Sequence, residues 1–565
     1  MEREQIRKEY DRWRKLAVTD GDVAAELQAM AGDEEKIADA FYRNLEFGTG
    51  GLRGVIGAGT NRMNVHTVAK ASQGLANYVK RMGGAQAGIA VSYDSRIKSD
   101  VFARTAAEVF AGNGIQVHLY GELMPTPCLS FAVRELSCAA GIMVTASHNP
   151  SKYNGYKVYG PDGCQITTKA AAEILAEIEA TDVFDGICRM EFEEAVQTGL
   201  IRYIGPEVVT AFIDAVKSQS VLGPADPVDK DVAIVYSPLN GTGLKPVLRT
   251  LKESGFTNIT VVKEQEQPDG NFPTCPYPNP EIREAMALGI EYAEKYNADL
   301  LLATDPDCDR VGIAVKNEKG EHVLLSGNET GMLLLDYICS RRSANGTMPE
   351  APVLVKTIVT IDMAERIAAH YGVETRNVLT GFKFIGEQIG LLEADGQESR
   401  YIFGFEESYG YLSGSYVRDK DAVDGAFLIC EMFAYYKAHG IGLWEKLQEL
   451  YRTYGYCFNT LHSFTFEGAA GFAKMQQIME TFRKGVAAIG GKRVEACLDY
   501  SLGLDGLPKS DVLKFLLEGH GSVVVRPSGT EPKMKVYVSV SAEDMDAARA
   551  AEGEIKEDIR RYFQE

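Results

Sequence analysis

The amino-acid sequence predicts an α/β protein built from several domains. With 565 residues, the chain is too long for a single hydrophobic core. Short apolar runs typical of buried strands alternate with helical patterns, and this alternation occurs in three successive units. Each unit ends in a polar loop that follows its last strand. The remaining tail has a different pattern, which is typical of a small α+β domain.

Composition narrows the class of protein. Apolar content of 45% and charged content of 24% are ordinary for a soluble globular protein. The net charge of −20 argues against a nucleic-acid partner. No apolar run reaches the ~18 residues that a membrane span needs, and the charged start of the chain does not resemble a secretory signal. Ten cysteines without a CxxC pair favour reduced thiols, so we expect a cytoplasmic protein with no membrane partner.

The first unit ends at a serine. Its last predicted strand delivers Ser147 on a tight turn, with His148 beside it and Lys157 further along. Because open α/β sheets bind ligands at the carboxyl ends of their strands, Ser147 is a candidate nucleophile. Hydrophobic periodicity predicts strands at 87–92, 115–120 and 139–144 and helices at 100–112 and 126–136.

The second and third units end at two acidic loops. The second delivers Asp305, Asp307 and Asp309, and the third delivers Glu406 and Glu407. We expect a hairpin after each of the three delivered loops. Three domains of shared architecture explain this order, although strands and helices alternate in any α/β chain. The predicted strands are 232–236, 258–262, 299–303, 353–357 and 401–403, and the predicted helices are 244–254, 281–296, 363–371 and 383–392.

The tail, from about residue 451, is predicted to form a separate α+β domain. Its hairpin loop contains Arg526, Ser528, Gly529 and Thr530. Arginine can bind phosphate through two parallel hydrogen bonds, and hydroxyl groups and glycine backbone add donors. An ordinary turn is the alternative, because Gly, Ser and Pro dominate turns. The predicted strands are 457–466, 522–525 and 535–540, and the predicted helices are 472–488 and 542–562.

Alternating aspartates can bring three carboxylate oxygens to one hard cation. An EF-hand is excluded, because Arg310 and Lys316 occupy the positions that need glycine and glutamate. Mg²⁺ fits better, since it prefers few protein ligands and shares phosphate oxygens. A phosphate on Ser147 would add about two negative charges. Arg310, Lys157 and His148 would then be the nearby cations. A solvated acidic turn is the alternative.

The glutamate loop is suited to a sugar. Glu406, Glu407 and the hydroxyl of Ser408 could hydrogen-bond vicinal sugar hydroxyls. Adjacent residues of an extended chain point to opposite sides, so the two glutamates cannot act as a glycosidase pair. We expect one of them to bind the ligand and the other to be structural.

Three further residues have a functional and a structural interpretation. Arg53 follows a glycine cluster and could reach an anion, but glycines also simply mark loops. Lys383 lies between two aromatic residues, where partial burial could lower its pKa for proton transfer. A lysine that extends its amine to water is the commoner case. His148 could likewise serve only to orient the serine turn.

The serine turn, the acidic loop with its arginine, and the run RPSGTEP at 526–532 occur together in this order. With them, the chain resembles the α-D-phosphohexomutase superfamily, and most closely its long phosphoglucomutase-type members. The resemblance covers nearly the whole chain. It implies three related mixed-sheet α/β domains and a C-terminal, TBP-like α+β domain around a central cleft. The domain boundaries are predicted at 1–203, 204–325, 326–450 and 451–565.

The resemblance also implies roles for the site residues. Ser147 would carry a phosphate, and the three aspartates would hold one Mg²⁺ together with that phosphate. Glu406 and Ser408 would bind the sugar. Arg310 would contact the phosphate on Ser147, and Lys157, His148 and Lys383 would transfer protons or contact anions. Arg526, Ser528, Gly529 and Thr530 would bind the substrate phosphate that is not reacting, and Arg53 is a further candidate for binding the substrate.

The activity implied is that of a mutase acting on a small phosphosugar. It would interconvert glucose 1-phosphate and glucose 6-phosphate, with glucose 1,6-bisphosphate as intermediate and activator. Tyr409 follows Ser408, as in phosphopentomutase-like branches of the superfamily, so a pentose 1-phosphate mutase is an alternative, as is a bisphosphate synthase. A sugar-phosphate sensor is the non-enzymatic alternative, although a sensor needs no metal-activated nucleophile. We expect a monomer or a dimer.

Overall fold

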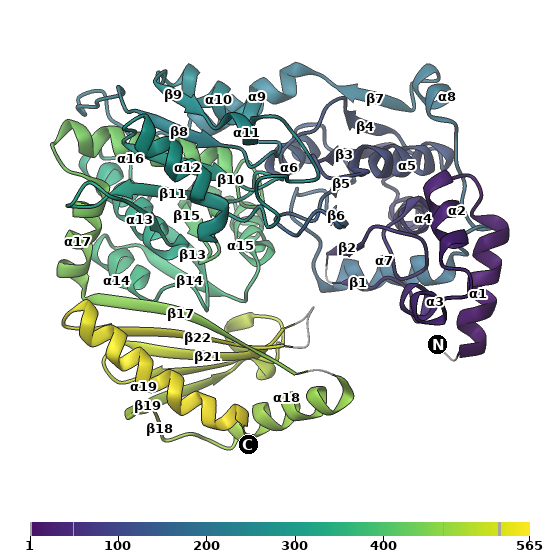
Figure 1. The fold of residues 1–565 in the computed structure, drawn as a ribbon. Coiled ribbons are helices and arrows are strands. Elements are labelled where there is room, and N and C mark those ends of the chain that lie inside the picture. Colours follow the sequence, from purple (N-terminus) through teal and green to yellow (C-terminus); the bar gives the residue numbers. More distant parts are fainter. Residues whose placement is uncertain (1–2, 49, 467, 529–532, 565) are drawn as a thin grey trace.

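The computed structural model describes residues 3–48, 50–466, 468–528 and 533–564. Four sheets follow one another along the chain, and Figure 1 shows the C-terminal sheet beside the third of the α/β domains. The predicted fold class is therefore confirmed. Within the described ranges, no helix combines the length and apolar character that crossing a bilayer requires.

The first sheet carries the serine turn between two of its central strands. Its order is β1-β2-β6-β5-β3-β4-β7, with β3 parallel to β4 and β5, and β6 antiparallel to β5 and β2. The apolar faces of α4, α5 and α7 pack against it. The strands are β1 (Phe47–Gly48), β2 (Gly51–Val55), β3 (Ile89–Tyr93), β4 (Val117–Tyr120), β5 (Ala140–Val144), β6 (Tyr153–Tyr159) and β7 (Ile201–Ile204). The helices are α4 (Val65–Arg81), α5 (Ser99–Gly112), α6 (Thr126–Glu135), α7 (Thr168–Ala180) and α8 (Phe192–Gln197).

A helical bundle precedes this sheet. Tyr10 and Trp13 of α1 (Arg3–Leu16) pack edge-on against Phe41 of α3 (Glu34–Phe41), and all three side chains are buried. Asp20 caps α2 (Gly21–Ala29), whose first turn would otherwise leave backbone N–H groups unpaired. The bundle lies against α4 and α7 at the N-terminal end of the molecule (Figure 1).

The second sheet delivers the aspartate loop. Its order is β12-β11-β10-β8-β9, in which β10 is parallel to β8 and antiparallel to β11. The predicted hairpin after the loop is β11 with β12. The strands are β8 (Ile234–Ser237), β9 (Ile259–Val261), β10 (Leu300–Thr304), β11 (Val311–Lys316) and β12 (His322–Leu325). The helices are α9 (Pro206–Lys217), α10 (Leu244–Glu253), α11 (Lys263–Glu266) and α12 (Arg283–Lys295).

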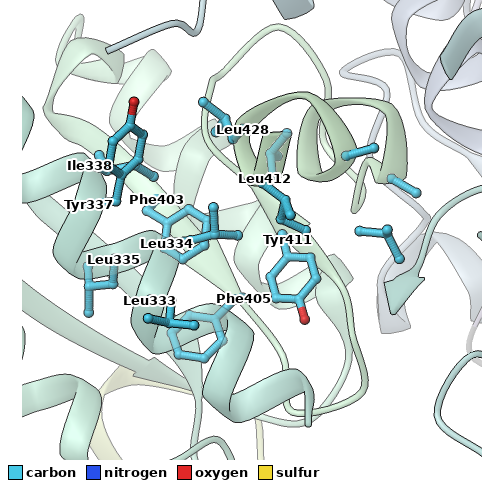
Figure 2. Close-up of a cluster of buried hydrophobic side chains, with 14 of the residues drawn as sticks. Leu333, Leu334, Leu335, Tyr337, Ile338, Phe403, Phe405, Tyr411, Leu412 and Leu428 are labelled. Carbon is cyan, nitrogen blue, oxygen red and sulfur yellow. The ribbon is translucent and has the colours of Figure 1, made fainter. Parts of the chain in front are cut away.

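The third sheet delivers the glutamate loop and has the order β14-β13-β15-β16. Leu333 and Leu334 of α13 pack against Phe403 and Phe405 of β15, and Figure 2 shows this buried cluster. The strands are β13 (Val353–Thr357), β14 (Glu374–Val378), β15 (Tyr401–Phe405) and β16 (Tyr411–Leu412). The helices are α13 (Gly327–Ala344), α14 (Met363–His370), α15 (Phe382–Ala394), α16 (Ala422–Ala438) and α17 (Leu443–Tyr454).

The C-terminal sheet is antiparallel, in the order β17-β22-β21-β20-β19-β18, and packs against α18 and α19. The predicted hairpin is β21 with β22, whereas β18 to β20 were not predicted. The strands are β17 (Tyr456–Thr465), β18 (Ala488–Ile489), β19 (Lys492–Asp499), β20 (Leu513–Leu517), β21 (Gly521–Pro527) and β22 (Lys533–Ala542). The helices are α18 (Gly468–Arg483) and α19 (Met545–Gln564).

Asp362, just before α14, joins the third domain to the C-terminal sheet. Its carboxylate lies 2.7 Å from the ammonium of Lys514 on β20 and accepts a hydrogen bond from Ser522 on β21. Lys356 of β13 lies 3.7 Å away, with a side chain that is fully buried. Asp362 thus contacts two largely buried cations at this interface, of which Lys356 also lies 3.1 Å from Glu365.

Replacing Asp362 by alanine should destabilise the C-terminal sheet locally by about 2 kcal/mol, because Lys514 loses the carboxylate that lies 2.7 Å from it, whereas Lys356 keeps Glu365. Hydrogen–deuterium exchange of β20 and β21 should therefore become faster than in the wild type. Glu350→Ala, at an exposed position of the same domain, is the matched control. Unchanged exchange in Asp362→Ala would contradict a stabilising role for this carboxylate.

Candidate active site

The turn between β5 and β6 holds Ser147 in a strained, left-handed backbone conformation, with φ of 52°. Its hydroxyl donates a hydrogen bond to Asp305 Oδ2 at 2.9 Å and lies 3.2 Å from His148 Nδ1. Its backbone N–H donates to Thr145 Oγ1 at 2.8 Å. The serine turn of the first domain and the aspartate loop of the second therefore meet, as predicted.

Arg96 fixes the serine turn and was not identified from the sequence. Its fully buried guanidinium lies 3.4 Å from Asp94. It donates hydrogen bonds to four backbone carbonyls of the turn and the start of β6, those of residues 147, 149, 150 and 153. Asp94 in turn accepts from Thr145 Oγ1 at 2.6 Å. This buried pair replaces the backbone partners that an irregular loop lacks.

Replacing Arg96 by methionine should therefore displace Ser147 and leave Asp94 buried without a counter-charge. We expect the free energy of unfolding to fall by about 3 kcal/mol. Turnover should fall by at least about tenfold, because a shift of the nucleophile by about 1 Å is costly. Thermal unfolding and steady-state kinetics check the two effects. Arg104→Met, at an exposed position within α5, is the control. An Arg96→Met variant as stable and active as that control would refute the role.

The aspartate loop is fully buried and could hold a metal ion. The ligand atoms of Asp305, Asp307 and Asp309 all lie within 4.8 Å of one another. Oδ1 of Asp307 and Oδ1 of Asp309 have no hydrogen-bond partner in the described structure. Buried carboxylate oxygens without partners are costly, and a divalent cation would satisfy both of them.

Two lysines form ion pairs with this carboxylate cluster. Lys157 of β6 lies 2.9 Å from Asp307 Oδ2 and 3.5 Å from Asp309 Oδ2. Lys420, which was not identified from the sequence, lies 2.8 Å from Asp309 Oδ2. Burial alone would lower the pKa of Lys157, but Asp307 and Asp309 outweigh it and raise that pKa. Both ammonium groups therefore remain charged and offset part of the negative charge of the cluster.

The two carboxylates of the glutamate loop have different surroundings. Glu406 is buried and accepts a hydrogen bond from the backbone N–H of Gly381 at 3.0 Å. Burial, opposed by Lys420, raises the pKa of Glu406 to about 7. Glu407 approaches the hydroxyls of Thr357 and Thr360 and, with Ser408, lines a cavity. In this conformation the neighbour, Glu407, and not Glu406, faces that cavity.

This cavity, of about 420 Å³, is lined by all four domains. His148 comes from the serine turn and Arg310 from the aspartate loop. Ser408 comes from the glutamate loop and Arg526 from β21. The central cleft implied by the resemblance is thus present. The remaining lining includes Glu281, Asn328, Thr360, Thr380, Asn459, Thr460, Lys535 and Tyr537.

The two arginines of the cavity are held differently. Arg310 lies 2.7 Å from Glu281, whereas its Nε has no hydrogen-bond partner among the described residues and lies 3.8 Å from Asp309 Oδ1. Arg526 contacts the hydroxyl of Tyr537 at 3.4 Å and is half-buried. Ser528 follows β21, and its N–H donates to the carbonyl of Lys533. Gly529 and Thr530 lie outside the described residues.

Comparison with known proteins decides the family. Sequence patterns for domains I, II and III of phosphoglucomutase/phosphomannomutase match residues 44–184, 210–320 and 326–454. The pattern for the C-terminal domain of the same family matches residues 472–557. The chain belongs to the phosphoglucomutase/phosphomannomutase family. The four matches fall in the order of the four sheets.

Relatives within the phosphoglucomutase/phosphomannomutase family are similar over their whole length. A phosphoglucomutase of Staphylococcus saprophyticus is 37% identical over 525 residues, which cover 91% of this chain and 93% of that protein. A phosphoglucomutase of Staphylococcus aureus is 38% identical over 521 residues, 90% of this chain and 92% of that protein. A crystal structure of a putative phosphomannomutase from Thermus thermophilus covers 93% of this chain and 100% of its own, with a TM-score of 0.68 at 23% identity.

The remaining predicted residues lie at different distances from the cleft. Arg53 of β2 is exposed and is not among the residues that line the cavity, although the charges of Asp307, Arg310 and Asp309 act on it. Burial, and then the charge of Arg310, lowers the pKa of His148. Lys383, at the start of α15, is not among the residues that line the cavity. Burial lowers its pKa, and its ammonium lies 5.2 Å from the ring centroid of Phe384.

Proposed function

We propose that this family member is a phosphoglucomutase, which interconverts glucose 1-phosphate and glucose 6-phosphate through a phosphoserine enzyme. One observation carries the proposal: Ser147 Oγ lies 2.9 Å from Asp305 in a buried cluster of three aspartates. A serine hydroxyl in that position is suited to accept and donate a phosphoryl group. The full-length similarity to staphylococcal phosphoglucomutases supports the choice of reaction.

Asp305, Asp307 and Asp309 would bind one Mg²⁺ together with the oxygen of Ser147. The two unpartnered carboxylate oxygens fit such an ion. When bound, Mg²⁺ would neutralise part of the negative charge on the phosphoryl group during its transfer. Arg310 and Lys157 supply fixed positive charge from the chain itself on two sides of the loop.

The half-reactions would follow from this geometry. Phospho-Ser147 gives its phosphoryl group to the 6-hydroxyl of glucose 1-phosphate, which forms glucose 1,6-bisphosphate; a side chain of the cleft takes the hydroxyl proton, and the released Ser147 oxygen takes up a proton. After the bisphosphate has turned around, Ser147 loses that proton and takes the phosphoryl group from position 1, and the sugar oxygen at position 1 is protonated as glucose 6-phosphate leaves. His148, Lys157 and Lys383 are the residues that we propose for proton transfer or anion contact.

The opposite side of the cleft would hold the rest of the substrate. Glu406 and Ser408 would bind sugar hydroxyls, for which the buried carboxylate of Glu406 must turn toward the cavity that Ser408 lines. Arg53 would contact an anion near the aspartate loop. Arg526, Ser528, Gly529 and Thr530 would bind the phosphate that is not reacting. The phosphate at position 1 and the phosphate at position 6 must each bind to these residues in turn. The C-terminal domain is therefore expected to open and close during turnover. Such an enzyme would act in the cytoplasm as a monomer or a dimer.

Turnover of glucose 1-phosphate and ribose 1-phosphate, each with and without glucose 1,6-bisphosphate, tests the proposal. We expect the hexose to be converted at least about tenfold more efficiently, with activation by the bisphosphate. A preference for the pentose would identify a phosphopentomutase. Net formation of bisphosphate would identify a synthase, and binding without conversion would identify a sensor.

A further inference from the structure

A second cavity, of about 630 Å³, lies between the N-terminal helical bundle and the first sheet. It shares no lining residue with the catalytic cleft. Figure 1 shows the elements that surround it, α1, β1, β2 and α7, at the N-terminal end of the molecule. Its apolar walls are formed by Leu45, Phe47, Leu52, Leu175 and Ile178. A cavity of this size with apolar walls is typical of small-molecule sites.

Lys70 of α4 places an ammonium group in this cavity. The charges that act on it come from Asp182, Glu179, Glu9 and Arg12, all of which line the same space. Lys70 is half-buried, and it forms no hydrogen bond or ion pair with any residue that the structure describes. Burial lowers its pKa. Its ammonium has lost part of its water without gaining a protein partner.

The other cations of the cavity differ from Lys70. Arg12 lies 2.6 Å from Asp182 and 3.8 Å from Glu9. Arg43 is more exposed and lies 3.8 Å from Glu46. Lys70 is therefore the lining cation for which the described part of the chain offers no contacting carboxylate. An anionic group on a bound molecule could fill that position.

We propose that this cavity binds a small organic molecule with an apolar body and a single anionic group, which pairs with Lys70. The apolar walls would cover the body, and the volume suits a ligand of drug-like size. Acidic residues around the same space, Glu9, Glu46 and Glu179, would disfavour a second negative charge. Sugar bisphosphates are thus unsuitable ligands for this site.

Strand β2 connects the second cavity with the surroundings of the aspartate loop. Leu52 lines the cavity, while its neighbour Arg53 is within reach of the charges of Asp307 and Arg310. Adjacent residues of a strand point to opposite faces, so Leu52 and Arg53 lie on opposite sides of β2. A ligand packed on Leu52 would therefore touch the strand that carries Arg53 without occupying the substrate site.

Binding of 8-anilinonaphthalene-1-sulfonate, a fluorescent aromatic monoanion, tests the proposal on the full-length protein. We expect one saturable site per chain, from which decanoate displaces the dye. Lys70→Met should weaken binding by about tenfold, since a charge-assisted contact is lost. Lys70→Arg should retain binding. Lys169→Met, which removes an exposed lysine of α7 outside the cavity, should leave it unchanged.

A second variant separates loss of the binding site from unfolding, in case Lys70→Met does not fold. Leu175→Glu adds a negative charge to the cavity wall and should weaken dye binding at least as strongly, with an unchanged thermal midpoint. The proposal is overturned if the wild type shows no saturable site. It is also overturned if both folded variants bind the dye as tightly as the Lys169→Met control. None of these readouts depends on mutase activity.

Discussion

Replacing Ser147 by alanine is expected to lower mutase turnover by about 10⁴-fold or more, because the variant lacks the nucleophile that the proposed mechanism requires. The hydroxyl that is lost donates a hydrogen bond to Asp305 at 2.9 Å. Alanine removes it without adding bulk, so the fold should be retained. A coupled assay that measures glucose 6-phosphate from glucose 1-phosphate gives the rate.

Ser151→Ala is the matched control for this prediction. Ser151 belongs to the same turn and is half-exposed. We expect Ser151→Ala to keep turnover within about threefold of the wild type, as for a surface substitution away from the site. Near-normal activity in Ser147→Ala would contradict the assignment of the nucleophile.

Replacing Asp307 by asparagine should have the second largest effect, a fall in kcat/KM of about 10²-fold or more. Asparagine keeps the shape of the side chain but removes one charge from the metal-binding cluster. In the wild type, Asp307 Oδ2 accepts hydrogen bonds from Thr126 at 3.0 Å and from Lys157 at 2.9 Å. The amide can still accept there, so a loss of activity reports on the metal and not on the fold.

Mg²⁺ binding gives the independent readout for Asp307→Asn. Calorimetric titration should show weaker binding of Mg²⁺ than in the wild type, and chelation should abolish wild-type activity until Mg²⁺ is restored. Glu318→Gln, in the exposed turn after β11, is the control for removal of one acidic charge. Equal Mg²⁺ affinity and equal turnover in Asp307→Asn and Glu318→Gln would exclude Asp307 as a ligand.

The sequence predicted those parts of the site in which the chemistry is local. Ser147 and the three aspartates each sit in a short motif after an apolar strand, and the structure brings them together. Arg96 and Lys420 were missed because nothing local marks them. Lys420 lies in a run of charged residues at 418–421, which is usually solvated, yet its partner Asp309 is more than a hundred residues away.

The same distinction applies to the fold. Strands with a continuous apolar pattern, such as β5 and β10, were predicted to within a residue or two. Strand β14 has the sequence ETRNV, is only partly buried and lies at the edge of its sheet, so it lacks the apolar signal on which the prediction depends. In β19, charged and apolar residues alternate on a half-exposed surface, and pairing with β20 decides its conformation.

Intact-mass and peptide mass spectrometry of the purified protein test the central claim, that Ser147 is the phosphoryl carrier of a metal-dependent mutase. After incubation with glucose 1,6-bisphosphate and Mg²⁺, we expect one added phosphate per chain, located on Ser147, and transferred on addition of glucose 1-phosphate. Ser147→Ala should gain none. A phosphate located on another residue, or a wild-type protein that takes up none under these conditions, would contradict this account.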